Sequence, residues 1–258
     1  MGAPTSPAVE LAREYGMRLI MRIPLEDNFS DIIGKAQRGL NLPGETAPAK
    51  LGLHAKALQA IADKTWYPND PGKIDGLACF NTPFDDMTVN SYAVFDPSTK
   101  EAAAFDTGAD CSGLLAFRIR QIFITHIHPD HIMELDRLKE KTGAKVCVSE
   151  REPIGGAETF TDGRTFSIGG LKVATRRTSG HARGGVTYVV TGLAKCLAIV
   201  GDAIFAGSMG GGAVSYEEAL RTNRESILTL PDDTVICPGH GPLTTVGEEK
   251  RHNPFFAR

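Results

Sequence analysis

QIFITHIHPDH, residues 121–131, is an apolar run that ends in three histidines and an aspartate. The apolar half predicts a buried strand, and side-chain alternation turns His126 and His128 the same way if the strand continues to them. The chain then turns at a proline, so Asp130 and His131 lie at the start of a predicted helix. Four ligand-type side chains therefore converge on one small volume, and imidazole with carboxylate is a donor set that suits Zn²⁺ and Fe²⁺.

Three later segments also place a ligand-type residue at a motif next to an apolar strand. His181 follows a glycine, Asp202 follows the apolar stretch 196–201, and His240 lies in PGHGP, residues 238–242, after another apolar stretch. An aspartate after a fully apolar strand is costly to bury unless it is paired or bound to a metal. Taken singly, His181 is more typical of a satisfied or surface histidine, and a capping role at the strand end is an alternative for Asp202. Their significance comes from occurring with the cluster at 126–131.

Short strands separated by a few helices are predicted after residue 72. The predicted strands are residues 89–95, 102–106, 121–126, 145–149, 165–176, 186–190, 196–201 and 234–237. A helix is predicted for residues 131–142, with Gly143 as its stop. The sequence SYEE at residues 215–218 is a capping box that begins another helix, which ends before Pro231.

These motifs in this order, HxHxDH, GH, GD after an apolar strand and PGHG, resemble the metallo-β-lactamase superfamily. The resemblance covers roughly residues 75–258, and the segments 201–208 and 238–249 are most similar to its short glyoxalase II-like (hydroxyacylglutathione hydrolase-like) branch. The resemblance implies an α/β fold, an αββα sandwich in which the ligands lie on loops at one edge of two packed sheets.

The resemblance also implies a site for two divalent metal ions. Zn²⁺ is the expected metal, and Fe or Mn are alternatives. The implied ligands are His126, His128 and His181 for the first ion, Asp130, His131 and His240 for the second, and Asp202 as a bridge. Asp106, in a DTG sequence after a predicted strand, is expected to orient a ligand histidine or a loop. His54 and His252 lie outside the pattern and are expected to be surface or helix histidines.

The function expected from such a site is hydrolysis of a thioester or related acyl bond by a metal-bound hydroxide. Asp130 is the candidate catalytic residue, which holds the nucleophile or moves its proton in addition to binding metal. Two departures argue against a glutathione-specialised enzyme. Gly211 stands where the branch usually carries an arginine, and the sequence ends at Arg258 without the helical domain of a full-length glyoxalase II.

Two other reactions remain open at the same site. Opening of a lactone or a β-lactam is chemically the same event as thioester hydrolysis. A persulfide dioxygenase would instead hold a single iron on two histidines and one aspartate, here His126, His181 and Asp202. Metal content and oxygen consumption separate the hydrolase from the dioxygenase.

The composition limits the cellular locations and the classes of partner to be expected. The 258 residues carry a net charge of −3, which favours neither a polyanion nor an anionic membrane as partner. The five cysteines are odd in number and form no CxxC pair, which indicates reduced thiols in a cytoplasmic protein. No run of about 18 apolar residues occurs, so no membrane span is expected. The expected partner is a small-molecule acyl substrate.

Two parts of the chain differ in pattern, a helical N-terminal accessory segment at 1–70 and the catalytic domain at 71–258. A helix is predicted for residues 50–64 and a linker for residues 66–72. Residues 1–70 carry eight Lys or Arg and eight Asp or Glu, so the segment lacks the basic face of a nucleic-acid-binding module. We expect it to act in packing, as a lid or in homo-oligomer formation.

Overall fold

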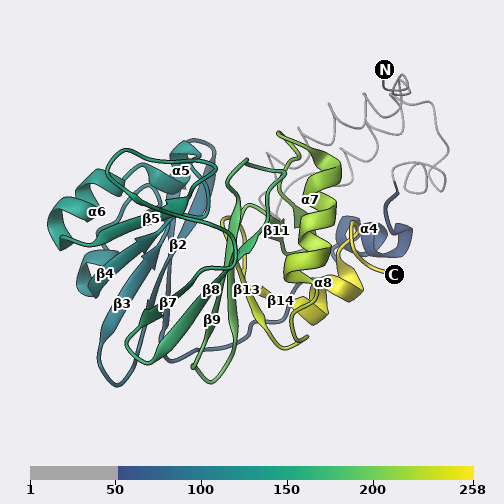
Figure 1. Ribbon diagram of the computed structural model, residues 1–258. Coiled ribbons are helices and arrows are strands. Elements are labelled where there is room, and N and C mark those ends of the chain that lie inside the picture. Colours follow the sequence, from purple (N-terminus) through teal and green to yellow (C-terminus); the bar gives the residue numbers. More distant parts are fainter. Residues whose placement is uncertain (1–51) are drawn as a thin grey trace, which may run out of the picture.

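The computed structural model describes residues 52–258 (Figure 1). Most of the predicted accessory segment therefore lies outside the described residues, and its boundary at residue 70 stays a prediction. The helices are α4 (Ala55–Ala62), η1 (Leu114–Ala116), α5 (Pro129–Ile132), α6 (Leu135–Thr142), α7 (Tyr216–Thr222), the π-helical turn η2 (Asn223–Ile227) and α8 (Val246–His252). Among the residues described, no helix is long and apolar enough to cross a membrane.

Two six-stranded sheets form the centre of the described region. The first contains, in spatial order, β1 (Leu77–Phe84), β2 (Met87–Phe95), β3 (Glu101–Phe105), β4 (Arg118–Phe123), β5 (Lys145–Ser149) and β6 (Glu158–Phe160). The second contains β14 (Thr244–Thr245), β13 (Val235–Pro238), β10 (Leu197–Gly201), β9 (Val186–Thr191), β8 (Leu171–Arg177) and β7 (Thr165–Ile168). A small hairpin joins β11 (Ile204–Phe205) to β12 (Ser208–Met209).

The sheets pack face to face through large aromatic side chains. Phe105 of β3 and Phe123 of β4 contact Tyr188 of β9, with ring centroids 5.4 and 5.2 Å from the tyrosine ring. Fully buried rings of this size dominate core energetics, and each stabilises the fold by about 1.5–3 kcal/mol relative to an exposed ring. The middle layer of the sandwich is therefore apolar, and it holds the loops at the strand ends in fixed places.

Helices cover the two outer faces, which completes the predicted αββα sandwich and confirms the fold class (Figure 1). Leu114 of η1 and Leu138 of α6 pack in one cluster with Ile122 on the first sheet. The second sheet is covered by α7, η2 and α8, whose buried residues join a cluster with Ile236. A helix on each outer face buries the apolar side of a sheet that would otherwise face water.

Strand direction decides where the polar loops meet. The strands β3, β4 and β5 are parallel to one another, and β10 is parallel to β13. The carboxyl ends of parallel strands lie at one edge of their sheet. The loops after β4, β10 and β13 carry His126, Asp202 and His240, so the topology brings these segments to the same edge of the sandwich.

Several predicted element boundaries are wrong. The strand predicted for residues 165–176 is a hairpin of β7 and β8, turned at Gly169 with φ of +55°. The helix predicted for residues 131–142 is divided into α5 and α6, although Gly143 ends it in the left-handed conformation as expected. The strand predicted for residues 121–126 ends at Phe123. β1 and β6 were not predicted.

Residues 52–70 pack against the C-terminal helix α8. The side chain of His54 caps α4 by accepting a hydrogen bond from the backbone of Ala57. Trp66 stacks on His252 with ring centroids 5.1 Å apart, and its Nε1 donates to a carboxylate oxygen of Glu248. The predicted helix is thus shorter than 50–64, and the start of the predicted linker is an anchored contact.

Candidate metal centre

Seven His and Asp side chains from five separate segments meet at one edge of the sandwich. Two histidines lie in the loop after β4, Asp130 and His131 on α5, His181 between β8 and β9, Asp202 after β10, and His240 after β13. The sequence prediction placed His126 and His128 on a continuing strand, but β4 ends three residues before His126. The two rings converge from an irregular loop instead.

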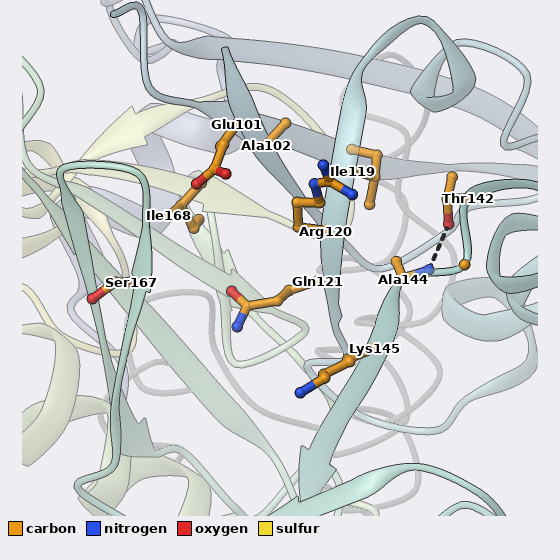
Figure 2. Close-up of a pocket in the computed structure, with 11 residues that line it drawn as sticks. Glu101, Ala102, Ile119, Arg120, Gln121, Thr142, Ala144, Lys145, Ser167 and Ile168 are labelled. Carbon is orange, nitrogen blue, oxygen red and sulfur yellow. Dashed lines mark hydrogen bonds between the residues drawn. The ribbon is translucent and has the colours of Figure 1, made fainter. Parts of the chain in front are cut away.

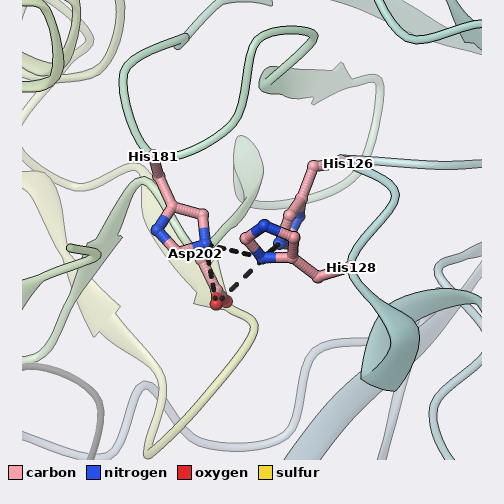
Figure 3. Close-up of side chains that lie close together, drawn as sticks. All are labelled: His126, His128, His181 and Asp202. Atoms are coloured by element: carbon pink, nitrogen blue, oxygen red, sulfur yellow. Dashed lines mark hydrogen bonds and ion pairs between the residues drawn. The ribbon is translucent and has the colours of Figure 1, made fainter. Parts of the chain in front are cut away.

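The first group consists of three histidines and an aspartate (Figure 3). Nδ1 of His128 lies 3.0 Å from Nε2 of His126 and 3.0 Å from Nε2 of His181. Oδ2 of Asp202 lies 3.5 Å from Nε2 of His181 and 3.9 Å from Nε2 of His126. Figure 3 shows the three rings turned toward one another beside the carboxylate of Asp202.

The second group consists of Asp130, His131 and His240. Oδ2 of Asp130 lies 3.4 Å from Nε2 of His131 and 3.2 Å from Nε2 of His240. Asp202 reaches this group as well, with Oδ1 3.2 Å from Nε2 of His131 and Oδ2 3.4 Å from Nε2 of His240. Its carboxylate thus lies between the two groups, as expected for a bridging ligand.

Hydrogen bonds at the far nitrogen fix the proton position of three of the rings. Nδ1 of His181 donates to the carbonyl of Gly211 at 2.8 Å, and Nδ1 of His240 donates to the carbonyl of Thr88 at 2.6 Å. Nδ1 of His131 lies 2.7 Å from Oδ2 of Asp106. A ring whose Nδ1 carries the hydrogen presents a lone pair at Nε2, the form in which imidazole binds a metal.

Asp106 orients the loop after β4 and the ring of His131 through hydrogen bonds. Its carboxylate accepts hydrogen bonds from the backbone N–H and the hydroxyl of Thr125, at 2.8 and 2.7 Å, besides contacting His131. The hydroxyl of Thr125 lies 3.0 Å from Nδ1 of His126 and, because it donates to Asp106, it accepts from that ring. The structure therefore places Asp106 where the sequence expected an orienting residue, and connects it to two histidines.

The buried polar atoms of the site fit a bound cation. Nε2 of His131 and Oδ1 of Asp202 are both buried without a hydrogen-bond partner. Such orphaned atoms are rare in folded proteins and call for an ion, a water or a functional explanation. Nδ1 of His128 faces two further imidazole nitrogens, an arrangement that one hydrogen cannot satisfy. The donor set of imidazole and carboxylate suits Zn²⁺, Fe²⁺ or Mn²⁺.

The pKa shifts agree with this electrostatic picture. Burial, followed by the neighbouring His131, holds the pKa of His126 well below its usual value, so that ring is neutral. Burial opposes the charge of Asp202, but the nearby His131 and His240 outweigh it and hold the carboxyl pKa well below its usual range. Burial likewise lowers the pKa of His128. Burial also lowers the pKa of His131 and His240, but the carboxylate of Asp202 outweighs it and raises both, to about 10 for His240, so a metal ion would have to displace a proton from these two rings.

Glycines adjoining the site let backbone approach the ligands. A Cβ at Gly239 would overlap Oδ1 of Asp202 and the ring of His131, and a Cβ at Gly210 would overlap the carbonyl of Asp202. Gly211 is different, because a Cβ there would meet nothing within 4 Å. The sequence motifs pointed to glycines near His240, but not to which positions exclude a side chain.

Asn90 of β2 holds the loop that carries His240 and was not found from the sequence. Its side-chain Nδ2 donates to the carbonyls of Pro238 and Gly241 at 3.0 and 2.9 Å, one on each side of His240. Its backbone N–H donates to the carbonyl of Gly239 at 2.7 Å. An asparagine inside a predicted strand gives no signal of such a role, which arises only from the contact between the two sheets.

A cavity of about 430 Å³ lies elsewhere, at the beginning of the parallel strands (Figure 2). Glu101 begins β3 and Lys145 begins β5, and both line this cavity with Arg120 and Gln121 of β4. The metal centre follows the other end of β4, so the cavity and the predicted site lie at opposite edges of the sheet. None of the seven predicted ligands lines the cavity.

Comparison with known proteins agrees with the fold. A family model described as the metallo-beta-lactamase superfamily matches residues 85–240. The probable metallo-hydrolase YqgX of Bacillus subtilis is 32% identical over 161 residues, which cover 52% of this chain and 74% of that protein. The hydroxyacylglutathione hydrolase GloC of Haemophilus influenzae is 27% identical over 188 residues, covering 61% and 88%. The crystal structure of the BLEG-1 B3 metallo-beta-lactamase matches with a TM-score of 0.59 and 28% identity, over 70% of this chain and 100% of that one.

Proposed function

The chain belongs to the metallo-β-lactamase superfamily, whose members are generally metal-dependent hydrolases, and from this premise we propose that it hydrolyses a thioester or a related acyl bond. The observation that carries the proposal is the meeting of seven His and Asp side chains in two adjacent groups that share Asp202. Each group alone offers enough donors for one ion, so the arrangement supports two divalent ions, Zn²⁺ first and Fe or Mn as alternatives.

The metal ions, when bound, supply Lewis acidity and bring the pKa of a coordinated water to about 7. A thioester suits a site of this kind because its leaving thiolate, with a pKa of about 8.5, departs without strong acid assistance. An amide would need a proton donor. The two ligand groups would hold the ions that polarise the carbonyl and activate the water, so no Ser or Cys nucleophile is required.

Asp130 is the residue proposed to handle the proton of the attacking water. Burial opposes its charge, but the hydrogen bond from His240, together with the nearby His131, outweighs burial and lowers the carboxyl pKa. Asp130 is therefore a carboxylate at neutral pH. Its Oδ2 faces the two histidines, whereas Oδ1 has no hydrogen-bond partner among the described residues and is left to accept a proton or a hydrogen bond.

The names of the relatives support two substrate classes, thioesters from the hydroxyacylglutathione hydrolase and β-lactams from the B3 metallo-β-lactamase. We place thioesters first and keep lactones and β-lactams as alternatives on the same site. Glutathione is not proposed as the preferred group, because Gly211 adds no side chain that could hold a carboxylate. The cytoplasmic location, the absence of nucleic-acid and membrane partners and a homo-oligomeric state stay predictions.

The test is a substrate panel with metal-replete protein. We expect turnover of simple thioesters, and turnover of S-lactoylglutathione with a KM near or above about 1 mM. Asp202→Ala should abolish hydrolysis, whereas His252→Ala, which removes a histidine outside the site, should retain it. Oxygen consumption on a persulfide by iron-loaded protein, without hydrolysis of any thioester, lactone or β-lactam, would assign the dioxygenase reaction instead.

A further inference from the structure

The cavity of about 430 Å³ at the beginning of the parallel strands presents charged side chains that the metal centre does not use (Figure 2). Sites for small-molecule ligands have volumes of about 300–1,000 Å³, so the cavity has room for one small molecule. Both sheets line it: β3, β4 and β5 contribute from the first, and Ser167 and Ile168 of β7 from the second. A ligand in this cavity would lie at the edge of the sandwich opposite to the metal centre.

Three polar side chains at the beginning of neighbouring strands project from one face of the first sheet. Glu101 of β3, Gln121 of β4 and Lys145 of β5 each precede by two residues a member of the apolar layer between the sheets. Those members are Ala103, Phe123 and Cys147. Side chains two residues apart on a strand point to the same face, so the carboxylate, the amide and the ammonium form a row on the inner face. Figure 2 shows all three extending toward the side of the cavity on which β7 lies.

The two charges at the ends of this row have opposite signs and are not paired with each other. None of the three side chains makes a hydrogen bond or ion pair with another described residue. Glu101 and Lys145 are held apart because β4 lies between their strands, which places the two strands about 10 Å from each other. Gln121 lies between them, and its amide can both donate and accept a hydrogen bond. The row therefore matches a ligand that carries an ammonium at one end and a carboxylate at the other.

Arg120 adds a second positive charge to the lining. The register between β3 and β4 shifts at this residue, which is left without a partner on β3 between Ile119 and Gln121. Such bulges re-aim a side chain and are over-represented next to functional sites. The exposed guanidinium lines the cavity and makes no ion pair with a described residue. With Lys145 and Glu101, the lining has two positive charges and one negative, which favours a ligand with one more negative than positive charge.

We propose that this cavity binds a small zwitterion of the acidic α-amino acid class, with its ammonium at Glu101 and its two carboxylates at Lys145 and Arg120. Gln121 accepts from the ammonium and donates to a carboxylate, and the buried side chains of Ile119 and Ile168 supply apolar surface for the methylene groups. The inference does not depend on the proposed hydrolysis, because none of the seven predicted metal ligands lines the cavity.

The experiment is calorimetric titration of metal-replete, full-length protein with L-glutamate and two analogues. Glutarate lacks the ammonium, and 4-aminobutanoate lacks one carboxylate. We expect saturable binding of L-glutamate with a Kd of about 1 mM or lower, since three charge-assisted contacts are sufficient for that affinity. Each analogue loses one of these contacts and should bind about tenfold more weakly or worse.

Variants of the two ends of the row separate the contacts. Glu101→Gln should weaken L-glutamate about tenfold and leave glutarate unchanged or tighter, so that the protein no longer distinguishes the two. Lys145→Gln should weaken both ligands. Glu158→Gln and Lys172→Gln, which change exposed charges on β6 and β8 outside the lining, should affect neither. Thermal unfolding without ligand shows whether each variant is folded.

A second titration, after removal of metal with a chelator and dialysis, excludes binding at the metal centre, because amino acids themselves coordinate metal ions. Binding of L-glutamate that persists supports the inference, whereas binding that is lost with the metal would overturn it. Absence of saturable binding, or tighter binding of glutarate than of L-glutamate, would overturn it as well. None of these titrations measures hydrolysis, so their failure leaves the proposed function standing, and failure of the substrate panel leaves this site standing.

Discussion

Nε2 of His131 lies 3.2 Å from Oδ1 of Asp202, and both atoms are buried without a hydrogen-bond partner. Two lone pairs at this distance repel unless a positive charge lies between or beside them. Burial lowers the pKa of His131, but the carboxylates of Asp202 and Asp106 outweigh it and raise that pKa well above its usual value. The site therefore attracts a proton where a metal is not bound, and a metal ion competes with that proton.

Asp106→Asn should weaken metal binding without removing a ligand. The neutral amide no longer stabilises the hydrogen on Nδ1 of His131, and it disturbs the hydroxyl contact with Thr125. Loss of such an orienting partner typically costs 10–100-fold in metal affinity. Competition with a chromogenic chelator measures the change. Asp96→Asn is the matched control, because that buried carboxylate caps a turn at the other end of the sandwich and should leave affinity unchanged.

Asn90→Ala should destabilise both the fold and the second ligand group. The variant loses two side-chain hydrogen bonds to the loop that carries His240 and leaves buried carbonyls unsatisfied, a cost of about 1–3 kcal/mol. We expect a lower midpoint in urea and loss of one metal equivalent before the other on dialysis. Asn81→Ala, at an exposed partner of Asn90, should cost less than about 1 kcal/mol. Equal effects of the two variants would contradict the role given to Asn90.

Glu249 should make the protein less stable as the pH rises toward neutrality. Burial raises the pKa of this carboxyl to about 7, against hydrogen bonds from Thr244 and Asn253 that lower it. Because the folded state holds a proton that the unfolded state releases near pH 4.5, stability falls between about pH 4.5 and 7 and is level above. The shift corresponds to about 3 kcal/mol.

Glu249→Gln should remove this pH dependence. Its amide oxygen can accept from the N–H of Gly207 and from Asn253, while its NH₂ donates to the hydroxyl of Thr244. Urea unfolding at pH 5, 6, 7 and 8 is the measurement, and the variant should be the more stable protein at pH 8. Glu248→Gln is the control: the pKa of Glu248 is lowered, so its own contribution is lost only at acid pH and the decline toward pH 7 should persist. An unchanged decline in Glu249→Gln would show that another group is responsible.

Gly211→Arg should improve recognition of an anionic thioester. A Cβ at this position would meet nothing within 4 Å, and the residue does not have a left-handed φ, so a side chain can start here without a backbone clash or strain. We expect the KM for S-lactoylglutathione to fall several-fold, with little change for uncharged thioesters. Gly210→Arg cannot serve in this way, because its Cβ would overlap the carbonyl of Asp202 and metal content should fall. An unchanged KM in a folded, metal-loaded Gly211→Arg protein would show that the new side chain does not reach the substrate.

The sequence was sufficient to predict which side chains gather, because each predicted ligand lies in a motif next to an apolar strand. It did not predict how they gather. His126 and His128 converge from an irregular loop after Phe123, where the hydrogen bonds to Asp106 replace strand pairing. Assignment of the seven residues as ligands stays a prediction until metal is measured.

Long-range contacts explain what the sequence left out. The hydrogen bonds from Asn90 to the loop of His240 join residues about 150 positions apart. Such bonds do not change the hydrophobic pattern of either segment. The same applies to the hydrogen bond from Trp66 to Glu248, which joins residues 182 positions apart. It anchors the start of a segment that the sequence predicted to be a linker. Hydrophobic period and turn residues report local structure, so they predicted strands such as Lys145–Ser149 with correct bounds but not these contacts.

Metal content tests the central claim most directly. Elemental analysis of metal-replete protein, set against activity, should approach two equivalents of Zn, Fe or Mn per chain. Asp202→Ala should lose the most metal, because it removes a carboxylate that faces both ligand groups. A stable content of one equivalent with full activity, or an Asp202→Ala protein that retains two equivalents, would contradict the account of a shared two-metal centre.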